Sequence, residues 1–205
     1  MRILLFGATG TLGSRIAAEL TERGERVTSA SRTGHSPSPD IPAVTVDPTD
    51  SDSVAAAAEG YDAIASAVHI DPDNVTAVTQ GLLDGARKAG VRRIAFVGGA
   101  GSLKVPDGGD LVDTPTFPAE WKPIGLAHRD ELNLIRPVTD LDWSYLSPAA
   151  AIAPGERTGK FRMGGDDLIV GDDGNSFVSA EDYAVAFADE LEQGNAIRRR
   201  ITVGY

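Results

Sequence analysis

Short runs of apolar residues alternate along this chain with longer stretches in which apolar positions recur at helical spacing. The runs predict five buried strands, at residues 3–6, 26–31, 41–46, 63–68 and 93–97. The longer stretches predict helices at residues 12–23, 51–59 and 73–89, because their apolar side chains fall on one face. Regular alternation of this kind predicts an α/β fold with a doubly wound parallel sheet, since crossovers between parallel strands are right-handed.

The second half of the chain continues the alternation. Three further elements are expected there: a helix at residues 123–134, a strand at 143–146 and a strand at 201–203. Ser179, with Asp182 three residues later, forms a capping pattern that predicts the start of a last helix. That helix is expected to end near Leu191.

Two segments interrupt the pattern. Residues 103–118 are rich in Pro, Gly and Asp and lack periodicity, which predicts a mobile loop. We expect this loop to lie over a ligand cleft at the carboxyl ends of the strands. Residues 154–178 contain short apolar runs at 161–163 and 168–170, which predicts a small hairpin lobe on the substrate side. We therefore expect one domain spanning residues 1–205, with 154–178 as its lobe.

Glycines follow the first predicted strand at a spacing that suits a bound phosphate. Gly7 allows a tight turn, Gly10 allows the backbone to approach a ligand, and Gly13 allows close packing of helix against sheet. The free amides of the following helix would face an anion. An ordinary turn is the alternative, but the strand before and the helix after favour nucleotide binding by residues 7–13, namely Gly7, Ala8, Thr9, Gly10, Thr11, Leu12 and Gly13.

Other polar and glycine-rich positions are expected near this turn. In doubly wound sheets, ligands bind beyond the carboxyl ends of the strands. Several predicted strands end at residues that can contact a ligand: Ser31, Arg32, Asp47, Val68, His69 and residues 98–102. The sequence therefore predicts one cleft at this edge of the sheet.

Composition narrows the possible partners. The net charge of −11 disfavours nucleic-acid binding, which needs clustered cations. The chain lacks Cys, and its three histidines are far apart in sequence, so no metal site is expected. No apolar stretch is long enough to span a membrane, and no signal peptide is recognised. We expect a soluble cytoplasmic protein that binds a small molecule; the sequence gives no oligomeric state.

Several motifs together resemble one protein family. They are the spacing of Gly7, Gly10 and Gly13, Asp47 after the third strand, and residues 97–102, 142–148, 154–161 and 181–184. With these motifs the chain resembles the atypical short-chain dehydrogenase/reductase family, in the NAD(P)H-binding branch of biliverdin-reductase-B-like and NmrA-like proteins. The resemblance covers the whole chain and implies a Rossmann-type fold.

The resemblance implies that the turn after the second strand selects the cofactor. An acidic residue there would bind the ribose diol of NAD, whereas a basic one pairs with the 2′-phosphate of NADP. Arg32 offers bidentate donors and Ser31 a hydroxyl, and no acid follows before Asp40, so NADP(H) is favoured over NAD(H). The alternative is that Arg32 is a solvated strand end.

The same resemblance implies further cofactor contacts. Asp47 would meet the adenine side, although it could instead, or also, cap the following helix. The remaining expected positions lie along the path of the cofactor: Ala67, Val68, His69, Gly98 and Pro148.

Typical enzymes of the family use a Tyr with a Lys four residues later, and this pair is absent. Ser102 matches the position of the family's upstream serine and could donate to a substrate carbonyl, or could simply form a turn. His128 could supply a proton or be a partly exposed helix residue. Trp121 could form an aromatic wall or pack structurally, and Phe161 is a second candidate for substrate contact.

Three functions remain open at this stage. The first is an NADPH-dependent oxidoreductase that reduces a small conjugated acceptor, such as a flavin or quinone, by hydride transfer without the Tyr-Lys pair. The second is an NADP-binding regulatory protein that senses redox state, which the missing pair favours. The third is an NAD-dependent epimerase or dehydratase, which usually carries a larger substrate domain than this chain offers.

Overall fold

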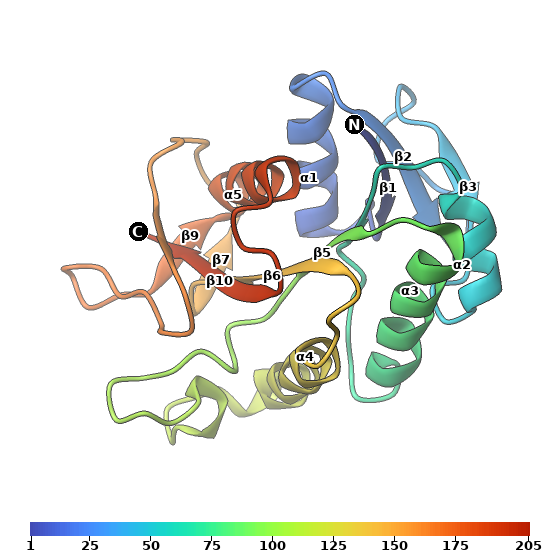
Figure 1. Ribbon diagram of the computed structural model, residues 1–205. Helices are drawn as coiled ribbons and strands as arrows, with labels where there is room; N and C mark the ends of the chain where they lie inside the picture. The colour runs from blue at the N-terminus through green and yellow to red at the C-terminus, as the bar shows by residue number, and fades with distance from the viewer.

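The computed structural model describes residues 1–205 and contains one eight-stranded sheet, shown in Figure 1. Its strands are β1 (Arg2–Phe6), β2 (Arg26–Ser31), β3 (Ala43–Thr45), β4 (Ala63–Ser66), β5 (Arg93–Val97), β6 (Asp142–Pro148), β8 (Arg162–Gly164) and β10 (Arg199–Gly204). Their order is β3-β2-β1-β4-β5-β6-β10-β8, and every pairing is parallel except that of β8 with β10. The predicted doubly wound, Rossmann-type parallel sheet is confirmed.

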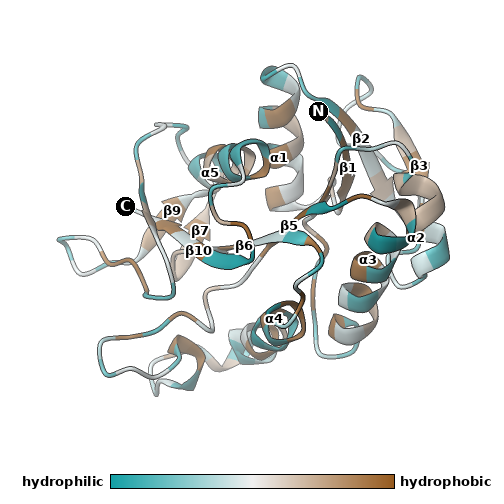
Figure 2. Cartoon of the chain, viewed as in Figure 1, coloured by the Kyte–Doolittle hydropathy of each residue, from teal (hydrophilic) through white to brown (hydrophobic).

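Helices cover both faces of the sheet. One face carries α1 (Thr11–Glu22) and α5 (Ala180–Gln193), and the other carries α2 (Ser51–Ala58), α3 (Val75–Ala89) and α4 (Lys122–Ile135). Strand β1 contributes to both cores because successive side chains point to opposite faces: Leu4 and Phe6 face α2 and α3, whereas Ile3 and Leu5 face α1. In Figure 2 β1 is mostly hydrophobic, while α1 and α3 carry both colours. No helix combines the length and the apolar character needed to cross a bilayer.

The segment after β6 differs from its prediction. No hairpin forms between residues 161–163 and 168–170; instead β8 pairs antiparallel with β10, and residues 168–170 form no strand. The side chain of Ile169 packs over Gly164 and Gly204, the two glycines of that strand pair. A separate parallel pair joins β7 (Ala151–Ala153) to β9 (Phe177–Ser179). Residues 162–164 therefore pair with the edge of β10 rather than with the neighbouring residues 168–170.

Residues 103–118 are more ordered than a structureless loop. They contain a 3₁₀ turn at Leu111–Asp113, followed by a second at Ala119–Trp121. Val112 is buried, and Asp110 forms ion pairs with Lys104 and with Arg129 of α4. This segment is therefore attached to α4 by charge pairing and by burial.

Residues 155–160 are attached to the helices α1 and α5. The buried carboxylate of Asp182 accepts hydrogen bonds from the Thr158 hydroxyl, the Gly159 amide and the Tyr205 hydroxyl. Arg157 adds a bidentate ion pair with Glu19 on α1, with donor–acceptor distances of 2.7 and 2.9 Å. These contacts fix where the chain enters β8.

Replacing Asp182 by Asn should destabilise the protein in a pH-dependent way. Burial raises the pKa of Asp182, but the hydrogen bonds from Thr158, Gly159 and Tyr205 outweigh burial and hold the pKa below its ordinary value. The ionised form therefore stabilises the fold above about pH 4, and this contribution is lost as the pH falls through the folded-state pKa. We expect a loss of about 1–3 kcal/mol of unfolding free energy at pH 7, measured by urea denaturation.

At pH 3 the difference between Asp182→Asn and wild type should become smaller. Asp172→Asn is the matched control, because Asp172 is an exposed carboxylate between β8 and β9 whose side chain makes no hydrogen bond. An equal loss at both pH values would contradict a role for the ionised carboxylate.

Candidate functional site

The glycine turn after β1 is fixed by close backbone packing. Gly7 has φ +74°, and a Cβ there would lie 2.3 Å from the carbonyl oxygen of Ala67. A Cβ on Gly13 would lie 2.0 Å from the carbonyl oxygen of Gly7. Gly10 is different, because its Cβ would lie 3.4 Å from the nearest atom, again the Gly7 oxygen. Gly7 and Gly13 are thus needed for packing, whereas Gly10 leaves open space beside the turn.

The N-terminus of α1 carries no protein cap. Gly10 is the N-cap residue, no side chain accepts from the first-turn amides, and no acidic residue lies in that turn. In contrast, Asp50 caps α2 and Ser179 caps α5. The positive end of a helix stabilises anions. Uncapped amides beside an open glycine therefore fit the phosphates of a dinucleotide.

Two cavities meet at this turn along the carboxyl edge of the sheet. They share four lining residues: Gly10, Ala67, Val68 and His69. One cavity lies at the end of β2 and beside the turn that follows β3, and the other lies at the ends of β5 and β6. The arrangement forms one elongated cleft across the position where the strand order reverses, beside β1 and β4. We call these two parts the β2-side cavity and the β6-side cavity.

The β2-side cavity contains the residues predicted to select the cofactor. Arg32 is exposed and makes no hydrogen bond or ion pair, although its charge acts on Asp47. Ser31 Oγ accepts from the His35 amide at 3.1 Å, which leaves its own hydrogen free to be donated. Free cationic and hydroxyl donors at this end of the cleft can bind an anion.

Asp47 lies in the same cavity but does not cap a helix. Its Oδ1 accepts from the amide and the hydroxyl of Thr49, at 2.9 and 2.8 Å, and these bonds lower the pKa of Asp47. Asp50 caps α2 instead, accepting from the Asp52 amide at 2.9 Å. The alternative that Asp47 is the helix cap is therefore wrong, because Asp47 closes the turn before the cap. Its Oδ2 makes no hydrogen bond within the protein.

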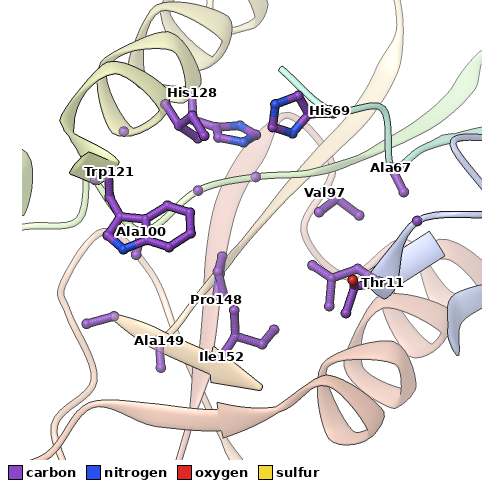
Figure 3. A pocket seen from close by; sticks show the side chains of 18 of the residues that line it. Thr11, Ala67, His69, Val97, Ala100, Trp121, His128, Pro148, Ala149 and Ile152 are labelled. Atoms are coloured by element: carbon purple, nitrogen blue, oxygen red, sulfur yellow. The ribbon is translucent and has the colours of Figure 1, made fainter. Parts of the chain in front are cut away.

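Figure 3 shows the β6-side cavity, whose walls are mainly apolar. His69 and His128 lie toward one end of this view, Pro148 and Ile152 toward the other, with Trp121 across from Thr11. Trp121 is 56% exposed, so most of its indole is not packed against protein. An open apolar space bounded by an aromatic side chain and two imidazoles can accept a flat molecule.

Most predicted cofactor residues line the cleft. Those that do are Gly7, Thr9, Gly10, Thr11, Leu12, Ser31, Arg32, Asp47, Ala67, Val68, His69, Gly98 and Pro148. Ala8 and Gly13 do not line it; they are buried behind the turn. These assignments stay predictions, with Ala8 and Gly13 in supporting positions.

The structure places two predicted residues outside the cleft. Ser102 is buried and lines neither cavity, and its Oγ accepts a 3.4 Å hydrogen bond from Arg200, so the expected contact with a substrate carbonyl has no support in this structure. Phe161 packs against the core that includes α5 and lines neither of the two cavities. Its predicted contact with substrate therefore has no support in this structure.

Several cavity residues were not predicted. Phe117, Ile124 and Ile152 add apolar wall, and none belongs to a motif. Glu131 and Tyr145 lie directly behind His128: Glu131 Oε2 is 3.0 Å from His128 Nδ1 and 3.0 Å from Tyr145 Oη. The i, i+3 spacing of His128 and Glu131 in a helix is a signal that could have found this pair.

Comparison with known proteins identifies the family. A model of the NAD(P)H-binding family matches residues 7–193. A crystal structure of a protein from Burkholderia pseudomallei, described as a "putative exported protein", is 51% identical over all of both chains with a TM-score of 0.93. The chain therefore belongs to the NAD(P)H-binding family.

Two further solved structures are similar over their whole length. A "putative epimerase" from Bacteroides thetaiotaomicron is 38% identical, covers 100% of this chain and 96% of its own, and has a TM-score of 0.93. A "putative NADH-flavin reductase" from Streptococcus pneumoniae is 32% identical, covers 100% and 99%, and has a TM-score of 0.85.

Proposed function

We propose that this protein is an NADPH-dependent reductase of a small conjugated acceptor such as a flavin or quinone. The observation that carries the proposal is the continuity of the two cavities at Gly10. A dinucleotide with its phosphates at this turn would extend its adenosine into the β2-side cavity and its nicotinamide into the β6-side cavity. The apolar space beyond then receives the acceptor.

The protein's own contribution to the reaction would be to orient the acceptor and to exclude water from the reacting atoms. When bound, the reduced nicotinamide supplies the hydride. Trp121 and Ile152 bound a flat acceptor from different sides of the cavity, and the apolar lining limits water around the reacting atoms. The missing Tyr-Lys pair disfavours alcohol oxidation and epimerisation more than reduction of an activated acceptor.

The preference for NADP(H) is part of this proposal. Arg32 and Ser31 offer a guanidinium and a hydroxyl at the end of β2, where the ribose of the adenosine half would lie. Neither donor is committed to a protein acceptor. A 2′-phosphate would satisfy both, whereas a ribose diol would leave the positive charge without a partner.

Two other functions remain candidates for specific reasons. Absence of the Tyr-Lys pair fits an NADP-binding redox sensor, and one 38% identical relative is described as an epimerase. Measuring turnover of different substrates distinguishes the reductase, the redox sensor and the epimerase. We expect NADPH oxidation with quinones or flavins and no activity on nucleotide sugars; saturable NADPH binding without turnover of any acceptor would favour the sensor.

Replacing Trp121 by Ala should weaken binding of a flat acceptor and leave cofactor binding unchanged. Contacts with an aromatic ring contribute about 0.5–1.5 kcal/mol beyond buried area, so we expect KM for the acceptor to rise roughly 3–10-fold. The measurement is steady-state NADPH oxidation at varied quinone. Met163→Ala is the control, because Met163 is an exposed apolar residue outside both cavities. Equal KM changes in the two variants would argue against an aromatic wall.

A further inference from the structure

A buried carboxylate supports the imidazole that faces the cavity. Glu131 is 1% exposed, whereas the His128 side chain above it is 15% exposed and lines the β6-side cavity. His128 Nδ1 lies 3.0 Å from Glu131 Oε2. Tyr145 Oη lies 3.0 Å from the same oxygen, 2.9 Å from the His128 carbonyl oxygen and 3.3 Å from His128 Nδ1.

This arrangement bears on which nitrogen of the His128 ring carries a hydrogen. A carboxylate oxygen accepts hydrogen bonds, so the contact with Glu131 favours the tautomer that carries a hydrogen on Nδ1. Burial raises the pKa of Tyr145 well above its ordinary value, and the charge of Glu131 adds to this, so the phenol stays a donor. The geometry thus favours a ring with its hydrogen on Nδ1, directed toward Glu131, and leaves Nε2 without a protein hydrogen-bond partner.

A second observation, independent of these hydrogen bonds, concerns the chain after β5. A Cβ on Gly98 would lie 2.1 Å from Tyr145 Cε1, and a Cβ on Gly99 would lie 2.8 Å from His128 Cβ and Cγ. The backbone thus packs directly against both rings. Any larger residue at Gly98 or Gly99 would displace the phenol or the imidazole.

We propose that His128 is a catalytic acid whose Nε2 donates a proton to the oxygen of a conjugated carbonyl acceptor, with Glu131 and Tyr145 as positioning residues. This inference rests on the proposed reductase function. Hydride addition brings two electrons and leaves an enolate or hydroquinone oxyanion. The N–H bond at Nε2 of the imidazolium then breaks, an O–H bond forms, and the neutral ring recovers a proton from water.

The proposal narrows the class of acceptor. A quinone or an enone reduced by hydride carries a basic oxygen or enolate and gains from a nearby acid. A flavin that takes hydride at its ring nitrogen can leave as an anion and needs no proton from the protein. His128 therefore points to conjugated carbonyl compounds rather than to flavins as the acceptors for which the cavity is built.

The first test uses the ligand-free protein. Imidazole ¹⁵N NMR should show the neutral His128 ring protonated at Nδ1 in wild type. Glu131→Gln should shift the population toward the Nε2-protonated form. Asp130→Asn is the control, because Asp130 is the exposed neighbour on the same helix. An Nε2-protonated ring in wild type would overturn the positioning role of Glu131.

The second test compares acceptors at saturating NADPH. His128→Gln should lower kcat for a quinone or enone by roughly 10²–10⁴-fold, and flavin reduction by less than about threefold. Glu131→Gln and Tyr145→Phe should lower kcat for the quinone or enone by smaller factors without changing KM. If Glu131→Gln fails to fold, Tyr145→Phe still tests whether the positioning of His128 matters. NADPH binding, followed by fluorescence, should be unchanged in all three.

The outcomes separate this inference from the proposed function. If wild type reduces quinones and His128→Gln does so equally fast, the catalytic role of His128 is wrong while the reductase function stands. If wild type reduces no acceptor, the reductase function fails and the acid role fails with it. The tautomer measurement decides the positioning role in either case.

Discussion

Replacing Gly10 by Asp is expected to abolish dinucleotide binding while leaving the ligand-free protein at least as stable as wild type. Gly10 is the uncapped N-cap of α1, with φ −74° and ψ 172°, a backbone conformation open to any residue. Its Cβ meets nothing closer than 3.4 Å. An Asp there can accept from the free amides, and relative to Gly this stabilises a helix by a few tenths of a kcal/mol.

The same carboxylate would occupy the position proposed for the phosphates. It would satisfy the amides that a phosphate needs and repel the ligand, and like charges placed together cost several kcal/mol. We expect the Kd for both NADPH and NADH to rise at least about 100-fold, measured by fluorescence titration. The apparent Tm without ligand should be unchanged or slightly higher.

Gly10→Asn is the matched control for charge, because Asn has nearly the same size and caps equally well. It should weaken binding less than Gly10→Asp does. If Gly10→Asp bound NADPH normally, the phosphates could not lie at this helix, and the proposed orientation of the cofactor would be wrong. If Gly10→Asp unfolded the ligand-free protein, a side chain at this position would not fit beside the turn.

Arg32→Glu is expected to change the cofactor preference. Hydrogen bonds between charged groups contribute about 1.5–3 kcal/mol, so loss of the guanidinium should raise the Kd for NADPH by roughly 10–150-fold. NADH lacks the 2′-phosphate, so its Kd should change by less than about threefold. Because the Arg32 side chain is exposed and makes no hydrogen bond or ion pair within the protein, the stability of the folded state should change little.

The control for this substitution is on the same strand. Arg26→Glu makes the same change of charge at the opposite end of β2, outside the cleft. It should leave the ratio of NADPH to NADH affinity unchanged. Equal weakening of both nucleotides by Arg32→Glu would remove the assignment of Arg32 to a 2′-phosphate and leave it as a solvated strand end.

Elements with strong local signals could be predicted from the sequence. The helix predicted at residues 73–89 is observed at Val75–Ala89, because its apolar face and its terminating Gly90 are encoded within one short stretch. The glycine turn is equally local. The parallel sheet also followed, since alternating strands and helices leave few other topologies.

Elements that depend on distant partners could not be predicted in this way. The partner of β8 is β10, more than 30 residues later in the chain, and nothing in residues 161–170 indicates that choice. The position of Ser102 after β5 predicts a place in the cleft, but Ser102 is buried, and its hydroxyl oxygen accepts a hydrogen bond from the buried guanidinium of Arg200. The contact of Tyr145 on β6 with His128 and Glu131 on α4 likewise appears only in three dimensions.

The continuous sheet has a consequence for how the cleft can exclude water. Both cavities lie along the carboxyl edge of one eight-stranded sheet, and neither lies between two lobes that could close over a bound acceptor. Enzymes with lids or hinged domains shield the reacting atoms by motion. Here the shielding would come from the acceptor itself, so small acceptors would leave the reacting atoms wet and planar polycyclic ones should be reduced faster.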